Sequence, residues 1–230
     1  MNTTPTLVQL YKTLGCASHQ KDGIDWLQCN TAADRAVVLI HGVTGGKMDM
    51  LPVAERFVAA GFAVHSVNLP GHGQSVMPPL GSYDDLSDWL LRAFAVMDIS
   101  PALVISNSFA SSIVYHALLR DVLPQETKVV LACPTPETSS LADFLQRTGE
   151  LMPERFGWWL YNCAPAQRLR IRMALKTSKQ DALQWLRESE RTKAATVSLD
   201  VTNKLTALLY RRGPYHKGVS PASQRRVRRA

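Results

Sequence analysis

Short apolar runs rich in β-branched residues alternate with longer helical patterns over roughly the first 132 residues. The predicted strands are residues 24–29, 36–40, 63–68, 102–105 and 128–132, and the predicted helices are residues 49–60, 82–97 and 109–120. Strict alternation of this kind is typical of βα units that form a largely parallel sheet. The sequence therefore predicts an α/β fold.

Two local patterns support this reading. The run Ala36–Ile40 is apolar on both faces, as expected for a central strand that is covered on each side. Ser82 and Asp85 have the spacing of a capping box at the start of the second predicted helix, residues 82–97. With 230 residues, the chain is long enough for one such domain.

The cysteines and the N-terminus bear on the environment of the protein. Cys16, Cys29, Cys133 and Cys163 are widely spaced and form no C-x-x-C pair, so four reduced structural thiols are expected. Neither a metal nor an organic cofactor is implied. Without a long apolar run or a signal-peptide pattern near residue 1, the predicted location is cytoplasmic.

The net charge of +7 belongs to the C-terminal tail, which holds seven basic residues and no acidic one. The basic residues are Arg211, Arg212, Lys217, Arg225, Arg226, Arg228 and Arg229. The rest of the chain is neutral overall, so the basic balance indicates no electropositive face on the folded body. Because no aromatic platform or recognition motif accompanies the tail, contact with nucleic acid or acidic lipid is not expected.

The segment Ile105-Ser-Asn-Ser-Phe-Ala110 places a serine where an apolar strand meets a helical pattern. In a nucleophile elbow the serine occupies a strained strand-to-helix turn, and its neighbours two positions away must be small. Ser106 and Ala110 occupy those two positions around Ser108. This pattern indicates Ser108 as a nucleophile. The alternative is that Ser108 serves only as the N-cap of the helix that follows.

A second motif, His41-Gly-Val-Thr-Gly-Gly46, follows the predicted strand at residues 36–40. A glycine-rich turn at this place lets a backbone N–H face a developing oxyanion, and the residue after the nucleophile supplies the second donor. The predicted donors are the N–H groups of Val43 and Phe109. For His41, and for His72 in the later Pro-Gly-His-Gly turn, structural hydrogen bonding is favoured over proton transfer.

Taken together, residues 36–132 resemble the α/β-hydrolase family. Asn68-Leu-Pro-Gly-His-Gly-Gln-Ser75 is similar to the loop after the fourth strand in the family's esterases, lipases and C–C hydrolases, and Ser-Asn-Ser-Phe-Ala is similar to the G-N-S-x-G elbow. The resemblance implies a mostly parallel sheet flanked by helices. It also implies a Ser–His–Asp triad that forms and hydrolyses an acyl-enzyme.

The resemblance further implies a division of the chain into three parts. Residues 1–133 correspond to the hydrolase core, residues 134–210 to a helical lid or cap, and residues 211–230 to a basic, disordered tail. The tryptophans of the lid region either line a pocket or serve ordinary packing.

The acid and the base of the triad have no clear counterpart, because in this family they follow the lid. After Tyr210 the chain has no acidic residue and a single histidine, His216. Glu137 and His216 are the candidates that remain for acid and base. The change of composition near residue 210 favours the hypothesis that the chain is truncated or frameshifted, with the last strands missing and a sheet edge left open.

The resulting prediction is a serine hydrolase that acts on a small-molecule carboxylic ester or thioester. The alternatives are a catalytically inactive homologue and a ligand-binding module on the same fold. The sequence leaves the substrate and the oligomeric state open.

Overall fold

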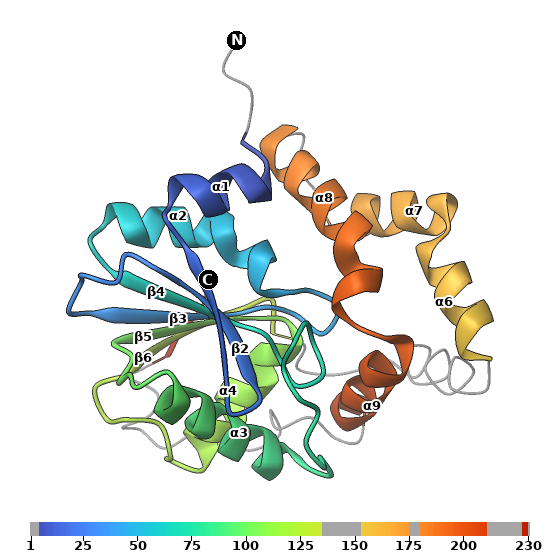
Figure 1. Ribbon diagram of the computed structural model, residues 1–230. Coiled ribbons are helices and arrows are strands. Elements are labelled where there is room, and N and C mark those ends of the chain that lie inside the picture. The colour runs from blue at the N-terminus through green and yellow to red at the C-terminus, as the bar shows by residue number, and fades with distance from the viewer. Residues whose placement is uncertain (1–4, 135–152, 175–179, 211–226, 230) are drawn as a thin grey trace.

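A computed structural model of the chain describes residues 5–134, 153–174, 180–210 and 227–229 (Figure 1). Within these ranges, seven strands form one sheet with the order β1-β2-β4-β3-β5-β6-β7. The strands are β1 (Ala17–Lys21), β2 (Ile24–Cys29), β3 (Ala36–Ile40), β4 (Ala63–Val67), β5 (Leu103–Asn107), β6 (Lys128–Ala132) and β7 (Val227–Arg229). Strand β2 pairs antiparallel with both of its neighbours, β1 and β4. The other neighbouring strands, from β4 through β3, β5 and β6 to β7, are parallel. The predicted α/β fold with a mostly parallel sheet is confirmed.

Helices lie on both faces of this sheet and beside it (Figure 1). They are α1 (Leu7–Thr13), α2 (Leu51–Ala59), α3 (Tyr83–Val96), α4 (Phe109–Leu119), α6 (Glu154–Asn162), α7 (Ala164–Ala174), α8 (Gln180–Thr196) and α9 (Leu199–Tyr210), with a short 3₁₀ helix, η1 (Lys47–Met50), before α2. The predicted capping box opens α3, where the Ser82 hydroxyl accepts the Asp85 N–H and the Asp85 carboxylate accepts the Ser82 N–H.

Strand β3 shows how the sequence divides the core between the two faces. Val38 and Ile40 face a cluster that includes side chains of α3, α4 and α9, while Val37 and Leu39 face a cluster with α1 and α2. All four side chains are at most 1% exposed. This two-sided burial confirms the prediction of a central, covered strand and fixes the carboxyl end of β3 inside the molecule.

Three elements of the fold were not anticipated. Helix α1 and strand β1 precede the first predicted strand, and β1 is polar and largely exposed because it lies at the sheet edge. In the basic tail, for which no strand is expected, Val227–Arg229 forms the three-residue strand β7 parallel to β6. A run this short, flanked by arginines, carries no recognisable period.

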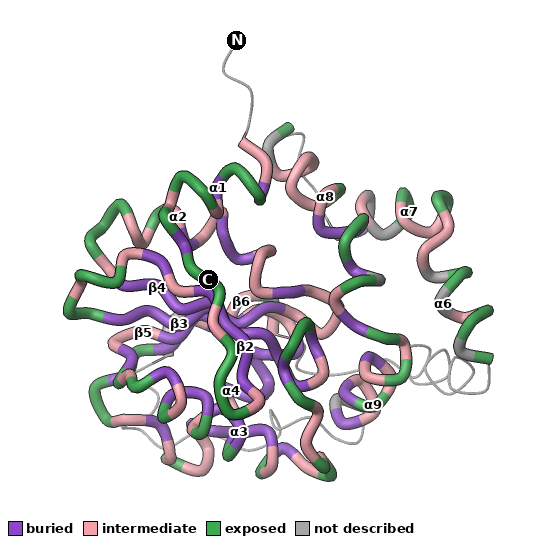
Figure 2. Tube along the Cα trace, in the orientation of Figure 1, coloured by how far each residue is buried: buried purple, intermediate pink, exposed green. Residues whose placement is uncertain are grey.

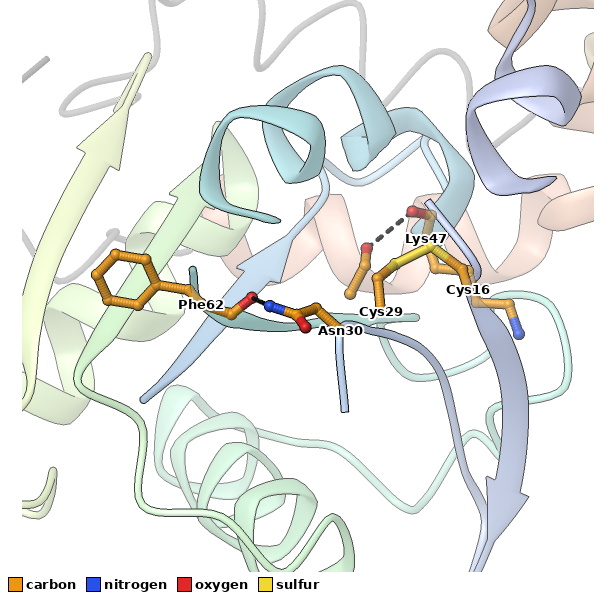
Figure 3. The surroundings of a disulfide bond; sticks show 6 residues. Cys16, Cys29, Asn30, Lys47 and Phe62 are labelled. Carbon is orange, nitrogen blue, oxygen red and sulfur yellow. Dashed lines mark hydrogen bonds between the residues drawn. A yellow bond between two sulfur atoms is a disulfide. The ribbon is translucent and has the colours of Figure 1, made fainter. Parts of the chain in front are cut away.

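The expectation of four reduced thiols is wrong for two of them. Cys16 and Cys29 form a disulfide, and Cys133 and Cys163 are free. The bond joins the turn after α1 to the end of β2, beside Lys47 (Figure 3). Sequence spacing did not reveal the pair, because α1 and β1 bring the two residues together only once the hairpin β1–β2 has formed.

The helical segment after the sheet has two parts that differ in burial (Figure 2). In α6 and α7, Phe156, Trp159, Leu160 and Leu169 are between 42% and 64% exposed. Helices α8 and α9 instead contribute buried side chains, among them Leu205 with no exposed surface. Only α8 and α9 are therefore built into the body. No helix among the described residues has both the length and the apolar character needed to cross a membrane.

Candidate functional site

Ser108 lies at the sharp turn between β5 and α4, as the sequence predicts. Its backbone has φ 52° and ψ −116°, a conformation that side-chain-bearing residues rarely adopt. Strain of this kind costs about 1–3 kcal/mol and persists only where the surroundings enforce it. Ser106 and Ala110, the small neighbours, have no exposed surface, so larger side chains have no room there.

Hydrogen bonds to the end of β6 hold the turn in this conformation. The Ser108 N–H donates to the Ala132 carbonyl at 2.9 Å. The Ser111 hydroxyl, one turn into α4, lies 2.9 Å from the Ser106 carbonyl oxygen and 3.1 Å from that of Ala132. The adjacent strand thus fixes the direction in which the serine leaves the sheet.

The glycine loop, residues 41–46, passes close to this turn. A Cβ added at Gly42 would lie 3.4 Å from the Ser108 Cβ, at ordinary van der Waals contact, so the loop backbone lies directly beside the serine. The Gly45 N–H donates to the Gly42 carbonyl at 2.8 Å and closes the loop into a turn.

His41 holds the first peptide of this loop. Its Nδ1 lies 2.8 Å from the Gly42 carbonyl oxygen, and its Nε2 accepts the Leu69 N–H at 3.1 Å. Because Nε2 is an acceptor, the ring is neutral with its proton on Nδ1. Burial, and next the proximity of His72, lower the pKa of His41 to about 3. Both nitrogens are engaged, which confirms a structural role.

His72 holds the next peptide. Its Nε2 lies 2.7 Å from the Val43 carbonyl oxygen, and its Nδ1 lies 3.0 Å from that of Pro70. Burial lowers the pKa of His72 below the ordinary histidine value. Its ring centroid is 4.9 Å from that of His41, with the two ring planes tilted by 54°. The two imidazoles thus contact the carbonyl groups of Gly42 and Val43.

This arrangement determines how the Val43 N–H is oriented. The Gly42–Val43 peptide is trans, so its N–H points opposite to the carbonyl that His41 and Gly45 hold. Among the described residues, the N–H groups of Val43 and Phe109 donate no hydrogen bond. Both remain predicted oxyanion donors, and the geometry leaves them unused within the described part of the chain.

Ser108 and the glycine loop line a cavity of about 430 Å³. Apolar side chains from three other parts of the fold complete much of its wall. They are Leu7 of α1, Met50 and Pro52 of η1 and α2, and Ala182, Trp185 and Leu186 of α8. A cavity with a mostly apolar wall and a few polar groups is the usual form of a small-molecule site.

One wall of the cavity is polar and was not predicted. Asp49, Ser189 and Lys193 line it, and Lys193 forms a buried ion pair with Glu190. Burial raises the pKa of Asp49 above its ordinary value, opposed by hydrogen bonds from Ser189 and Gly46. The spacing of Asp49 after Gly46, that of an acid at the third position of a helix, was the available signal. No pattern in the sequence of α8 marked Ser189 or Lys193.

A base for Ser108 is not found among the described residues. Besides His41 and His72, the described histidines are His19, His65 and His116, and none is bonded to Ser108. Glu137 and His216, the candidates from the sequence, lie outside the described residues. Within the described ranges, no three His, Cys, Asp or Glu side chains gather as a metal site requires.

Comparison with known proteins places this site in a family. The model of the alpha/beta hydrolase family matches residues 37–226. The 2-succinyl-6-hydroxy-2,4-cyclohexadiene-1-carboxylate synthase of Escherichia coli O157:H7 is 31% identical over 83 residues, which is 36% of this chain and 28% of that protein. The match thus spans less than a third of that curated relative.

Solved structures share the fold at low identity. A putative lipase from Acinetobacter baumannii AYE has 18% identity and a TM-score of 0.61, with 89% of this chain and 68% of that one covered. An esterase from Exiguobacterium antarcticum has 14% identity and a TM-score of 0.62, with coverage of 85% and 74%. Because the family model matches well over half of the sequence, from β3 into the tail, the chain belongs to the α/β-hydrolase family.

Proposed function

We propose that the protein is a serine hydrolase that cleaves a small-molecule carboxylic ester or thioester through an acyl-enzyme on Ser108. The observation that carries this proposal is the strained turn of Ser108 at the wall of a cavity, next to the glycine loop. Strain held in place by the surrounding structure is typical of functional sites. The esterases and lipases among the structural neighbours agree with this reaction class.

The chemistry assigns a role to each group around the cavity. Ser108 Oγ attacks the carbonyl carbon and its proton passes to a base, while the carbonyl oxygen becomes an oxyanion that accepts from the Val43 and Phe109 N–H groups. Collapse of this intermediate breaks the bond to the alcohol or thiol, which leaves with a proton. Water then cleaves the acyl-enzyme. One oxyanion donor typically contributes about 10²–10³ in rate.

In this proposal His216 is the candidate base and Glu137 the candidate acid. His41 and His72 are engaged with backbone groups, and no other described histidine is bonded to Ser108. In the same proposal, residues 134–210 form a lid. Trp185 and Leu186 of α8, which line the cavity, support a role of this segment in shaping the acyl pocket.

The alternative is a catalytically inactive homologue that keeps the cavity as a binding site. It is favoured by the lack of a base bonded to Ser108 among the described residues. Without a base the serine stays protonated, and the residual rate comes from binding and the oxyanion donors alone. Such a protein would be stabilised by ligands without turning them over.

Labelling with a fluorophosphonate, read by intact mass, separates these functions. We expect one label per chain in the native protein, none in Ser108→Ala, and full labelling in Ser100→Ala, whose serine is exposed in a loop. His216→Ala should label far more slowly if His216 is the base. A folded native protein that takes up no label contradicts the hydrolase proposal and favours the binding module.

A further inference from the structure

The polar wall of the cavity links the glycine loop to helix α8. The Asp49 carboxylate accepts the Gly46 N–H at 2.9 Å, at the end of the loop. Ser189 of α8 lines the same cavity as Asp49, and its hydroxyl is one of the groups that lower the pKa of the Asp49 carboxyl. A Cβ added at Gly45 would lie 2.9 Å from Asp49 Oδ2, so the carboxylate is packed directly against the loop backbone.

The surroundings keep Asp49 in this position. Ser189, Glu190 and Lys193 are all at most 9% exposed, and the Lys193 ammonium pairs with Glu190 beside the carboxylate. A half-buried carboxylate that accepts the Gly46 N–H and lines one cavity with Ser189 and Lys193 has few other conformations available, because a move would leave the loop N–H unpaired. The position of Asp49 therefore depends on where α8 lies.

The other anchors of the loop come from the body. His41 and His72 hold its first half, and the Lys47 N–H donates to Asn68 Oδ1 at 2.7 Å just after it. Asn68 is fixed in turn by buried Asp25, whose Oδ2 accepts the Asn68 Nδ2–H at 2.7 Å. Asp49 is thus an anchor on the side of the helical segment, where Thr196 of α8 also packs against Gly46.

We propose that Asp49 is a positioning residue through which helix α8 holds the glycine loop in the conformation that stabilises the oxyanion. The effect of Asp49 on the reaction rate rests on the proposed hydrolase function. Its effect on the conformation of the loop does not. Asp49 does not touch the reacting atoms.

Hydrogen exchange tests the structural half of this proposal without any need for activity. In Asp49→Ala and Ser189→Ala, amides of residues 41–50 should exchange about 10-fold faster or more, while those of α3 stay unchanged. Asp49→Asn keeps an acceptor oxygen and should restore part of the protection. The matched control is Thr192→Ala, because Thr192 is exposed on α8 and bonds only carbonyls of its own helix. Unchanged exchange at residues 41–50 in Ser189→Ala would overturn the proposal, and this variant is also the milder one if Asp49→Ala fails to fold.

Inactivation kinetics with the fluorophosphonate test the functional half. The maximal rate constant kinact should fall about 10- to 100-fold in Asp49→Ala with little change in KI, because the donors are displaced while the cavity remains. A general loss of structure would change both constants. An unchanged kinact in a variant with a loosened loop refutes the positioning role. If the native protein takes up no label, the hydrolase function fails, and exchange alone decides whether Asp49 holds the loop.

Discussion

Helices α8–α9 and helices α6–α7 belong to one helical segment, yet they relate to the sheet in different ways. At the α8–α9 junction, the Thr196 carbonyl accepts the Gly73 N–H at 2.7 Å. A Cβ added at Gly46 would lie 2.8 Å from Thr196 Cγ2, so this junction sits against two loops at the carboxyl ends of β3 and β4. In α6–α7, by contrast, no residue whose exposure the structure describes is buried (Figure 2).

The difference teaches that contact with the loops around the Ser108 cavity, rather than helical character, decides which part of the helical segment belongs to the site. Trp185 Nε1–H donates to the Pro5 carbonyl and Glu188 accepts the Leu7 N–H, so α8 is also tied to the N-terminus. The aromatic pair Phe156–Trp159 on α6 stacks with its rings 5.9 Å apart but stays exposed. We expect α8–α9 to unfold with the sheet and α6–α7 to open independently.

Acidification should give the largest effect, because it acts on buried histidines in strand β4 and in the loops after β3 and β4. Burial lowers the pKa of His41 to about 3 and that of His65 to about 4, so in acid the unfolded chain binds protons that the folded chain does not. Their stabilisation is complete above the unfolded pKa of about 6.5 and is lost as the pH falls toward the folded values. From pH 7 to pH 5 the two should remove roughly 4 kcal/mol, at about 1.4 kcal/mol per pH unit each below 6.5. Asp49, whose pKa is raised, has the opposite sign and reduces the loss.

Urea unfolding at the two pH values measures this loss, and hydrogen exchange followed in parallel locates it. Protection of α8–α9 should fall with that of the sheet, while α6–α7 should exchange fast at both pH values. Loss of exchange protection in α8–α9 at pH 5, while the sheet stays protected, would contradict the expectation that α8–α9 unfold with the sheet. His65→Asn should remove the share of the pH dependence that belongs to His65, about 1.4 kcal/mol per pH unit below 6.5, while buried His41 and His72 keep theirs.

A matched pair of leucines gives the next largest effect. Leu205 of α9 has no exposed surface, whereas Leu160 of α6 is 42% exposed. Leu205→Ala should destabilise the chain by about 3 kcal/mol through lost burial and a residual cavity. Leu160→Ala should stay within about 0.5 kcal/mol, as surface substitutions usually do. Similar values for both in urea unfolding would mean that the two helix pairs are equally integrated.

The contact between Gly71 and α9 should give the smallest effect. Gly71 has φ +73°, and a Cβ there would lie 2.8 Å from two methyl carbons of Val201. Gly61 has φ +79° with nothing within 4 Å, so Gly61→Ala reports the backbone strain alone, about 1 kcal/mol. Gly71→Ala should cost roughly 1 kcal/mol more than this control through crowding against Val201.

The double variant Gly71→Ala/Val201→Ala sharpens this measurement, because it removes the methyl groups in the way. Its coupling energy, measured by urea unfolding, should be favourable by about the same 1 kcal/mol. A coupling of zero would mean that α9 does not press on the loop that follows β4.

The strands and the turn of Ser108 could be predicted because their signals are local. A few adjacent residues are enough to predict these features, as in the apolar run Ala36–Ile40 and the small neighbours of Ser108. The structure bears out β2 to β6 and α2 to α4, with differences of a few residues at their ends. One such difference is at the start of the predicted helix 49–60, where the 3₁₀ helix η1 precedes α2 and carries Asp49.

What the sequence left out is held together by contacts distant along the chain. Ser189 lies 140 positions after Asp49, and β7 pairs with a strand about a hundred residues earlier. Neither pairing changes the local period of apolar residues, so pattern reading does not detect it. The Cys16–Cys29 bond escaped for a related reason, since four separated cysteines fit free thiols equally well.

That disulfide makes the redox state of the buffer a variable in every stability measurement on this chain. It cross-links residues 13 apart and therefore restricts the unfolded ensemble, with an expected contribution of about 3 kcal/mol for a loop of this size. Disulfides persist chiefly in oxidising compartments, whereas the predicted location is cytoplasmic. A sample handled in thiol reductant and one handled without it would therefore have different unfolded ensembles, and their free energies of unfolding could not be compared directly.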